Sequence, residues 1–344
     1  MSNDVEISVS IWGSFKDKSV YLFKLKNADG AYIELTNYGA TLVSAFVPDK
    51  KGELYSPVLG FTSLQGYLDD TCYVGSTVGR FANRIGNAQF PLNRSIYQLD
   101  TNENSNCNHG GKGGFNAKVF SHELSADGVC FSLTSHDGEN GFPGNLDVKV
   151  TYSWNSAREL KIHYHALSDK DTVANFTNHA YFNLNPSGSN ILDHELTVFS
   201  DHVLETDNQF IPTGFIKPAG PLMLNGATVG TKLKIGKSGR LEGINNCYIL
   251  DRKDAGGIAL AASLRALEAG TGIHVYTDYP SLMIYTGDFL SGSHKGHHGI
   301  EYHPFDGLCM ECQYYPDSPN HPHFPSTVLS QDEIYDKTII YKFI

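Results

Sequence analysis

The stretch "LDVKVTYSW", residues 146–154, alternates apolar and polar side chains without a break. A side-chain period of two is typical of a β-strand with one buried and one solvated face. After the turn-like "NSARE", the stretch "LKIHYHA", residues 160–166, repeats the pattern. The two stretches predict an antiparallel hairpin whose buried face carries Leu146, Val148, Val150, Tyr152 and Trp154 from the first strand and Leu160, Ile162, Tyr164 and Ala166 from the second.

Strand-like stretches of the same kind recur on both sides of this hairpin. "AYIELTNYGATLVSAFVPD", "GVCFSLTS" and "TIIYKFI" have this character, and clusters such as "DGENGFPGN" and "NPSGSN" are typical of turns. The stretch "IALAASLRALEAG", residues 258–270, has the composition of a helix, but its even positions up to 266 are apolar, as in a strand. Since we find no internal repeat or linker, the sequence predicts an all-β fold with one large antiparallel β domain over residues 1–344.

The composition limits the classes of partner. The chain of 344 residues carries 26 basic and 37 acidic residues, a formal net charge of −11. Such a surface repels nucleic acid and anionic membranes, so a small neutral substrate fits better than an anionic one. The N-terminal "MSNDVEISVS" lacks the basic and apolar regions of a secretion signal, and the apolar runs are too short for a membrane span. Six scattered Cys do not form a disulfide framework, so we expect a reducing, cytoplasmic location.

Two stretches carry a second face that is polar yet poor in charge. In "TVANFTNHAYFNL", residues 172–184, one parity reads Asn175, Thr177, His179, Tyr181 and Asn183. In "LCMECQYYPD", residues 308–317, the face opposite the apolar one reads Cys309, Glu311, Gln313 and Tyr315. Amides and imidazoles bond hydroxyls, and aromatic rings cover the C–H faces of a sugar. The two rows therefore fit a sugar site, although two ordinary solvated faces fit the pattern equally well.

Two glycine-bounded loops add candidate binding residues. "GRFANRIGN" contains Asn83 and Arg84, and "NCNHGGKGGF" places His109 directly before a glycine cluster. Glycine permits positive φ angles and close approach of the backbone to a ligand. A phosphate-binding loop is the alternative for the second stretch, but it would need Lys followed by Ser or Thr after the second glycine, and no such pair is present.

A zinc site is a further alternative near the end of the sequence. Cys309 and Cys312 form a C-x-x-C pair, and His321 and His323 follow in "NHPHFP". Zinc-binding pairs of this type usually lie on turns, whereas residues three apart in a strand point to opposite faces. The surrounding "LCMECQYY" has no residue that favours a turn, so we expect no metal here.

Six stretches in order, "GRFANRI", "NHGGKGGF", "GENGFPG", "TNHAYFNL", "YTGDFL" and "CMECQYYPDSPNHPHFP", resemble the aldose 1-epimerase (galactose mutarotase) family. They run from about residue 79 to residue 325, and the flanking strands extend the similarity over nearly the whole chain. The resemblance implies a single-domain, many-stranded β-sandwich of the galactose mutarotase type, in which residues 258–270 form a strand. It also implies an isomerase that interconverts the α and β anomers of a free sugar without cofactor or metal.

The resemblance also implies roles for individual residues. Glu311 resembles the general base of the family and His179 its general acid. The Glu311 carboxylate is expected to favour the imidazolium form of His179. The expected substrate contacts are Asn83, Arg84 and His109, which match the family, and Tyr181, which shares the polar row of His179.

Two positions depart from the family pattern. The family usually has an Asp where "GINNCYIL" has Asn245, and a hydroxyl-binding Gln where "YPSLMIYTG" has Met283. Asn bonds a hydroxyl without the charge that strengthens the bond, and Met donates no hydrogen bond. Both departures concern the sugar and not the reaction class. We expect a sugar of the glucose or galactose type, or maltose, whose second ring would pack against Met283.

Two other functions compete with the epimerase. A non-catalytic carbohydrate-binding or sugar-sensing protein on the same scaffold would not need Glu311 and His179 together. A sugar-phosphate epimerase would need a cationic clamp, and only Arg80 and Arg84 lie near the matched loops. Both a monomer and a homodimer are compatible with the sequence.

Overall fold

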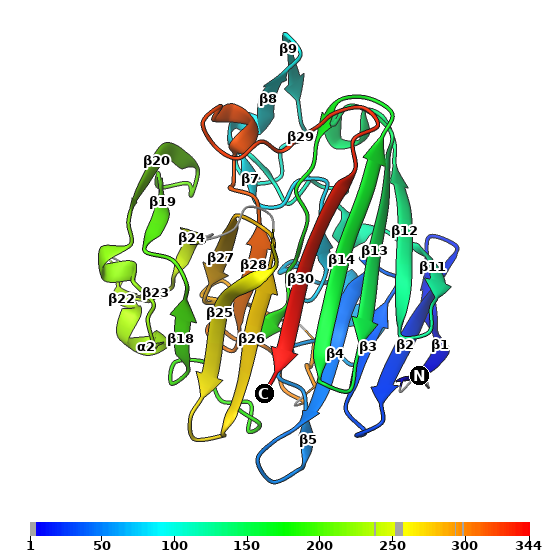
Figure 1. Cartoon of the computed structure of the whole chain (residues 1–344), viewed down its shortest axis with the longest axis vertical. Coiled ribbons are helices and arrows are strands. Elements are labelled where there is room, and N and C mark those ends of the chain that lie inside the picture. Colours follow the sequence, from blue (N-terminus) through cyan, green and yellow to red (C-terminus); the bar gives the residue numbers. More distant parts are fainter. Residues whose placement is uncertain (1–4, 237–238, 252–256, 293, 298) are drawn as a thin grey trace.

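The computed structural model describes residues 5–236, 239–251, 257–292, 294–297 and 299–344. Its largest element is a nine-stranded antiparallel sheet, which lies in front in Figure 1. In spatial order the strands are β11 (Ser121–Leu124), β12 (Gly128–Ser135), β13 (Leu146–Trp154), β14 (Glu159–Ser168), β30 (Tyr335–Phe343), β26 (Thr271–Thr277), β25 (Ala259–Ala266), β18 (Glu195–Val198) and β21 (Ala227–Thr228).

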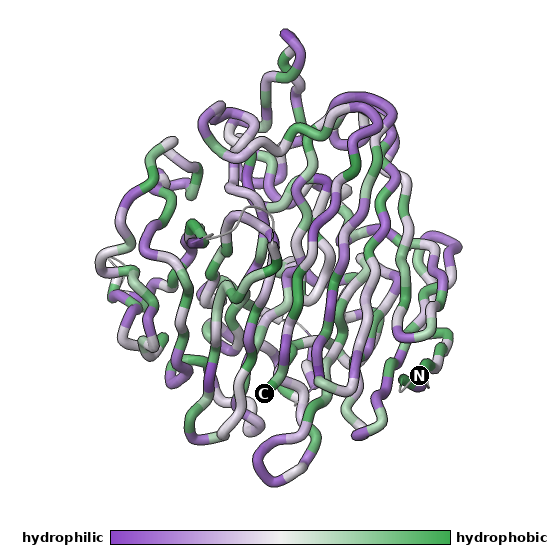
Figure 2. Tube along the Cα trace, viewed as in Figure 1, coloured by the Kyte–Doolittle hydropathy of each residue, from purple (hydrophilic) through white to green (hydrophobic). Residues whose placement is uncertain are grey.

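The predicted hairpin lies in this sheet as β13 and β14. Its pairing runs in register from Leu146 opposite Ser168 to Trp154 opposite Leu160. Side chains along β13 alternate between buried and solvent-facing, which is the period of two that the sequence shows. Figure 2 shows the same alternation of hydrophobic and hydrophilic residues along the neighbouring strands. The hairpin prediction is confirmed.

Two smaller antiparallel sheets lie behind the nine-stranded one. The six-stranded sheet has the order β17 (Tyr181–Phe182), β28 (Leu308–Gln313), β27 (Ser281–Tyr285), β24 (Asn245–Ile249), β19 (His202–Thr206) and β20 (Pro212–Pro218). The five-stranded sheet has the order β1 (Val5–Phe15), β2 (Lys18–Asn27), β3 (Tyr32–Thr36), β4 (Thr41–Pro48) and β5 (Leu54–Tyr55).

The main hydrophobic core lies between the nine-stranded sheet and these two sheets. Phe23 of β2 packs edge-on against Phe131 of β12, with ring centroids 5.3 Å apart. Phe182 of β17 packs against Tyr341 of β30 at 5.0 Å. Contacts of this kind hold sheets face to face through interdigitated side chains. The predicted all-β sandwich is confirmed.

Short elements connect the sheets. Five two-stranded ribbons are formed by β6 (Thr77–Val78) with β16 (Thr177–Asn178), β7 (Arg84–Ile85) with β10 (Cys107–Asn108), β8 (Gln89–Leu92) with β9 (Ser95–Gln98), β15 (Thr172–Val173) with β29 (Val328–Leu329), and β22 (Lys234–Ile235) with β23 (Leu241–Glu242). Helical turns in the described ranges are α1 (Leu64–Leu68), α2 (Val229–Lys232), η1 (Gly86–Ala88), η2 (Phe115–Ala117), η3 (Glu139–Gly141), η4 (Gly220–Leu222) and η5 (Ser318–Asn320). Within these ranges no helix has the length and apolarity needed to cross a bilayer.

Within the disputed residues 258–270, Ala259–Ala266 form strand β25, as the family resemblance implied, and residues 267–270 form a turn. A bulge between Leu260 and Ala262 interrupts its pairing with β26, so that Ala261 and Ala262 are both buried. The favourable helix composition is overridden because the strand lies between β18 and β26 with its apolar residues in the core. Helix propensity is a weak preference that such packing readily outweighs.

Residues 172–184 do not form the single strand on which the predicted polar row depended. They are divided among β15, β16 and β17, which pair with β29, β6 and β28 respectively. Asn178 produces one of the breaks, because its side chain accepts the Ala180 N–H at 3.1 Å and donates to the Gly75 carbonyl at 2.9 Å. Such side-chain bonds to the backbone favour a turn over a continued strand. The interpretation of one continuous polar face was therefore wrong.

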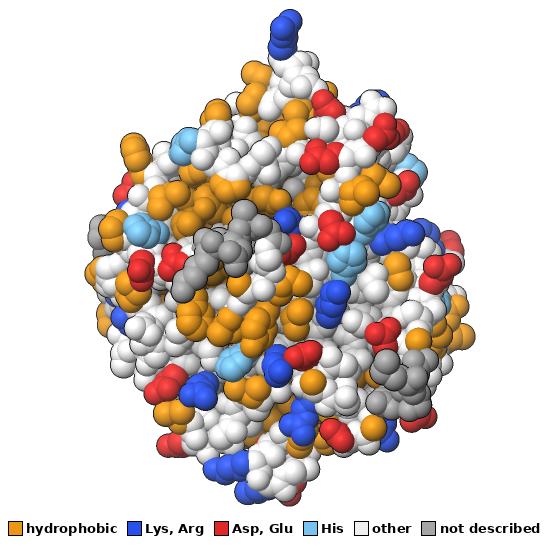
Figure 3. All heavy atoms as spheres, viewed as in Figure 1, with side chains coloured by type: hydrophobic (Ala, Val, Ile, Leu, Met, Phe, Trp, Pro, Cys, Tyr) orange, Lys and Arg blue, Asp and Glu red, His pale blue; other side chains and the backbone are white. Residues whose placement is uncertain are grey.

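Charged side chains are mixed over the surface. Figure 3 shows acidic and basic groups interspersed on the visible face, with hydrophobic side chains gathered between them. The net charge of −11 is thus not concentrated in one field on this face.

Candidate active site

A pocket of about 430 Å³ opens beside the six-stranded sheet. Strands β17, β24, β27 and β28 supply part of its wall. The loop before β6, the ribbon of β7 and β10 with its flanking loops, and the loop between β19 and β20 supply most of the rest. All eight side chains that the sequence singled out line this one pocket: Asn83, Arg84, His109, His179, Tyr181, Asn245, Met283 and Glu311. Residues separated by more than two hundred positions in the chain are thereby brought together.

Glu311 lies in the middle of β28 at the buried end of the pocket. Its residue surface is 2% exposed, and every other residue of β28 is buried as well. β27 pairs with β28 from Cys309 to Gln313, with Met283 opposite Glu311, whereas β17 pairs only with Leu308 and Cys309 at the start of the strand. One carboxylate oxygen, Oε2, is buried and has no hydrogen-bond partner among the residues that the structure describes.

His179 faces Glu311 from the turn between β16 and β17. The His179 Nε2 atom lies 3.8 Å from Glu311 Oε1, and both side chains are nearly inaccessible to solvent. The His179 N–H donates to the Ser76 carbonyl at 2.9 Å, and Nδ1 lies 3.5 Å from the Cys309 thiol. Burial raises the pKa of the Cys309 thiol well above its usual value, so the thiol is protonated, and the direction of its contact with Nδ1 follows the His179 tautomer. A neutral His179 with its proton on Nδ1 presents an unprotonated Nε2 toward Glu311.

Burial pushes both groups of this pair toward their neutral forms. Desolvation raises the pKa of Glu311 to about 8, and the Arg84 charge only partly opposes it. Desolvation lowers the pKa of His179 to about 4. The expectation that Glu311 would favour the imidazolium of His179 was therefore wrong, because the loss of hydration at this depth outweighs the attraction of one carboxylate. Between these two values the pair carries one proton.

Asn83 and His109 form the wall opposite Glu311 and bind each other. The Asn83 N–H donates to His109 Nδ1 at 3.3 Å, and the His109 N–H donates to the Asn83 carbonyl at 3.1 Å. Both residues have left-handed φ angles, 65° and 51°. Since burial holds the pKa of His109 well below its usual value, the ring is neutral, and occupation of Nδ1 leaves the proton on Nε2. His109 thus offers the pocket a hydrogen-bond donor.

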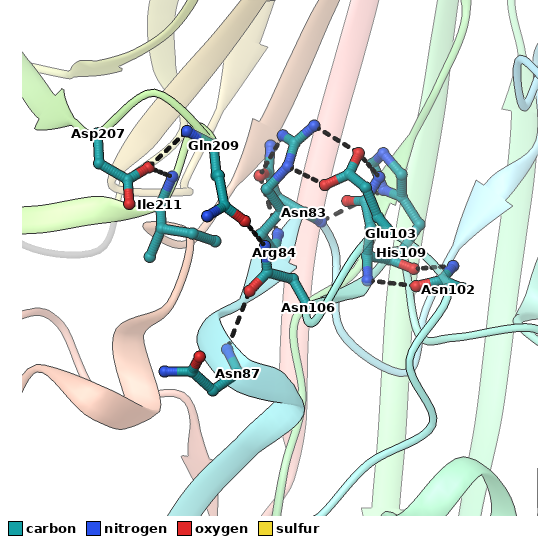
Figure 4. Close-up of polar contacts among 11 residues, drawn as sticks. Asn83, Arg84, Asn87, Asn102, Glu103, Asn106, His109, Asp207, Gln209 and Ile211 are labelled. Atoms are coloured by element: carbon teal, nitrogen blue, oxygen red, sulfur yellow. Dashed lines mark hydrogen bonds and ion pairs between the residues drawn. The ribbon is translucent and has the colours of Figure 1, made fainter.

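The Arg84 guanidinium forms an ion pair with Glu103 within the protein itself, as Figure 4 shows. Its Nε donates to Glu103 Oε2 at 2.5 Å and its Nη2 to Glu103 Oε1 at 2.8 Å. The guanidinium also lies over the Phe210 ring, with its central carbon 5.2 Å from the ring centroid. Glu103 and Phe210 were not predicted from the sequence. Neither lies in a motif, and their relation to Arg84 exists only in three dimensions.

Tyr73 is another pocket residue that the sequence analysis missed. Its ring lies 4.6 Å from the His109 ring and 5.8 Å from the His179 ring, so it packs against both imidazoles. It stands in "TCYVG", which has no pattern that would distinguish it from a core tyrosine. Tyr181, which was predicted, donates its hydroxyl proton to the carbonyl of Cys72, another lining residue, at 3.1 Å.

The two polar rows contribute to the pocket only in part. Of their nine members, the pocket is lined by His179, Tyr181 and Glu311. Asn175 instead donates to backbone carbonyls of Ala82 and Tyr314, and Gln313 is fully buried on β28. Most members of the two rows therefore lie outside the pocket lining.

His109, His179 and Glu311 have ligand atoms within 4.8 Å of one another, a spacing that a metal ion could bridge. Their surroundings do not suit a resident metal. A metal-binding His usually donates its other N–H to an acceptor, whereas His109 Nδ1 receives the Asn83 N–H. The Arg84 charge also acts on Glu311. The zinc alternative that the sequence analysis weighed is also not supported, because Cys309 and Cys312 pack into different hydrophobic clusters.

The pocket chemistry agrees with the family that the whole chain matches. The family model described as aldose 1-epimerase matches residues 21–342. The chain belongs to the aldose 1-epimerase family. The galactose mutarotase of Mus musculus is 37% identical over 329 residues, which is 94% of each chain. The aldose 1-epimerase of Escherichia coli strain K12 is 32% identical over 331 residues, 94% of this chain and 95% of that one.

Solved structures agree with the fold of this epimerase. A GalM/aldose epimerase homologue from C. elegans superposes with a TM-score of 0.85 at 29% identity, covering 92% of this chain and 96% of the other. A galactose 1-epimerase from Lactobacillus acidophilus gives a TM-score of 0.84 at 26% identity, with 99% of both chains covered. The chain is therefore an isomerase that interconverts sugar anomers, and the non-catalytic sugar-binding alternative is set aside.

The two departures from the family pattern lie on neighbouring strands of the epimerase pocket. Asn245 begins β24 and pairs with Tyr285 of β27. Met283 of β27 pairs with Cys247 on one side and with Glu311 on the other. Met283 therefore stands at the buried end of the pocket, beside the carboxylate, and is only 4% exposed.

Proposed function

We propose that Glu311 and His179 together carry out the proton transfers that open and close the sugar ring. Opening a pyranose hemiacetal removes the O1 proton, breaks the C1–O5 bond and adds a proton to O5. After rotation about C1–C2, the ring closes on the other face of the carbonyl and the two transfers reverse. An acid and a base must therefore flank one anomeric centre. The observation that carries the proposal is the 3.8 Å separation of His179 Nε2 and Glu311 Oε1 at the buried end of the pocket.

One proton on the pair suffices for this chemistry. Whichever group holds the proton gives it to O5, while the other takes the proton of O1, so the pair is restored after closure with the roles exchanged. The neutral form that burial favours, with the proton on Glu311, uses Glu311 as the acid and an unprotonated His179 Nε2 as the base. Each role is typically worth a factor of about 10² to 10⁴ in rate.

The donors opposite Glu311 suit the hydroxyl groups and the charge that develops during opening. His109 offers Nε2–H, and Arg84 retains N–H groups on Nη1 that Glu103 does not bind. Preorganised donors stabilise negative charge on O1 or O5 without reorganising during the reaction. Asn83 and Asn245 offer neutral amide groups to the remaining hydroxyls.

We propose a neutral hexose of the glucose or galactose type as the substrate, with maltose as a further candidate. Some relatives are named galactose mutarotases. Met283 is not the contact for a second ring, because it stands beside Glu311 at the end that would hold the anomeric carbon. A second ring would extend toward the mouth, where Phe289 is 68% exposed and Gln209 and Phe210 line the rim.

Polarimetry on freshly dissolved α-glucose, α-galactose and α-maltose tests this function. Wild-type protein should accelerate the decay of rotation, and Glu311→Gln and His179→Asn should each lower kcat by about 10² or more with an unchanged fold. Glu123→Gln on β11 and His165→Asn on β14 are matched controls, since both positions lie outside the pocket. If Glu311→Gln or His179→Asn keeps full activity, the assignment of that role fails.

A further inference from the structure

The charged groups of the pocket are few and unequally distributed. Among its lining residues, Arg84 is the one Lys or Arg, whereas Glu103 and Glu311 are both acidic. Glu311 stands at the buried end, and Glu103 stands beside Arg84 with 32% of its side chain exposed. A ligand that carries a negative charge would therefore meet a single cation that is already bound to a carboxylate.

Glu103 occupies the part of Arg84 that recognises anions. The guanidinium presents N–H groups in a rigid fork that matches a carboxylate or phosphate through two parallel bonds. Glu103 takes such a pair, with Oε2 on Nε and Oε1 on Nη2 (Figure 4). The remaining N–H groups lie on Nη1, which also donates to Asn83 Oδ1 at 3.5 Å, and on Nη2, and single N–H groups suit a hydroxyl oxygen.

The surrounding loop holds Glu103 in this position. Its N–H donates to the Asn106 carbonyl at 3.3 Å, and the Asn102 side chain bonds both the N–H and the carbonyl of Asn108. The Asn108 amide reaches Glu103 Oε1 at 3.5 Å. The carboxylate is thus part of a fixed network and does not depend on a mobile surface contact.

We propose that Glu103 is a specificity-determining residue that makes the pocket accept neutral sugars and reject sugars bearing a carboxylate or phosphate. It fills the anion-binding fork of Arg84 and adds its own repulsion to any incoming anion. This inference rests on the proposed function, because it takes Arg84 to face the sugar. It goes further in naming the residue that excludes a chemical class of substrate.

The test compares glucose with glucuronate, which has the same ring but a carboxylate at C6. Anomer exchange of both sugars is measured by NMR exchange spectroscopy with the wild type and with Glu103→Gln. The variant keeps the side-chain shape and removes the charge. We expect the ratio of kcat/KM for glucuronate to that for glucose to rise by about 10- to 100-fold, the range of a charge-assisted bond gained at Arg84.

A second variant separates this role from a merely structural one. In Glu103→Gln combined with Arg84→Met, the gain for glucuronate should disappear, because the freed fork is no longer present. Glu103→Asp keeps the charge and should keep the exclusion of glucuronate. An unchanged ratio in Glu103→Gln, or a gain that survives loss of Arg84, would overturn the inference. A wild type that does not accelerate glucose exchange would instead contradict the proposed function.

Discussion

Met283 and Glu311 are direct partners in the antiparallel pairing of β27 and β28. Side chains at paired positions lie on the same face of a sheet with Cβ atoms about 5 Å apart. The thioether thus stands next to a buried carboxylate, one of whose oxygens has no hydrogen-bond partner within the described part of the chain. A soft apolar neighbour provides no compensation for the lost hydration of Glu311, which agrees with the raised pKa of that group.

The pH dependence of activity should follow the proton count of the Glu311–His179 pair. With no proton the pair has no acid for O5, and with two protons it has no base for O1. We therefore expect kcat/KM to be level between pH about 4 and about 8 and to fall on both sides. Polarimetry, corrected for spontaneous mutarotation, measures the profile. A kcat/KM that keeps rising above pH 9 would show that an unpaired carboxylate is enough.

Met283→Gln should shift the alkaline limb of this profile to lower pH. The amide can donate to the free oxygen of Glu311, and a hydrogen bond to the charged form lowers the pKa of a carboxyl, here by about one unit. Met283→Leu fills the same space without a donor and should leave the limb at pH about 8. Equal shifts in both variants would point to packing and not to the hydrogen bond.

Replacing Arg80 by Met should mainly reduce stability, whereas replacing Arg84 by Met should mainly reduce kcat/KM. Arg80 is 2% exposed and donates to the carbonyls of Pro143, Gly144 and Ser135, so Arg80→Met should lower the free energy of unfolding by about 3 kcal/mol or more. Arg84→Met should change stability by no more than about 1 kcal/mol, because its ion pair is partly exposed, yet reduce kcat/KM. Urea unfolding measures the free energy of unfolding of both variants, and polarimetry measures their kcat/KM. Comparable losses of stability would refute the distinction.

Phe289 should matter for a disaccharide and not for a hexose. Phe289→Ala removes an exposed ring at the pocket mouth, and loss of ring stacking should raise KM for maltose about 2- to 10-fold while KM for glucose stays within about twofold. Phe215→Ala removes a ring of similar exposure, 69%, on β20 outside this pocket and serves as the control. If KM for maltose is unaffected, the second ring does not reach Phe289.

The elements that followed a simple period were predictable from the sequence. The alternation in residues 146–166 specified the β13–β14 hairpin because one face of that pair is solvated, so the pattern records which side is buried. Of the predicted stretch 308–317, only Leu308–Gln313 form a strand, β28. Both of its faces are buried, and the placement of Glu311 in it could be anticipated only as an anomaly in a strand. All eight residues singled out line one pocket, which follows from motif order and not from periodicity.

The parts that escaped prediction depend on contacts between distant segments. The break at Asn178 required knowing that Gly75 lies beside it. The neutral state of His179 depends on how deeply the sheet buries it, and a sequence does not report depth. Glu103 had no visible role until its fork-to-fork contact with Arg84 was seen.

Strand β30, residues 335–343, lies between β14 and β26 in the middle of the nine-stranded sheet. During synthesis, β14 is therefore without one neighbour until more than 160 later residues have been added. The hairpin β13–β14 and the pair β25–β26 leave the ribosome as separate pieces with unpaired edges, and only the late strand joins them. Such distant pairing makes folding slow, and the intermediates expose hydrophobic surface and unpaired strand edges through which they can aggregate. Newly made chains should accordingly depend on chaperones, and a frameshift or nonsense codon before β30 should cost the entire enzyme, although every pocket residue is already encoded upstream.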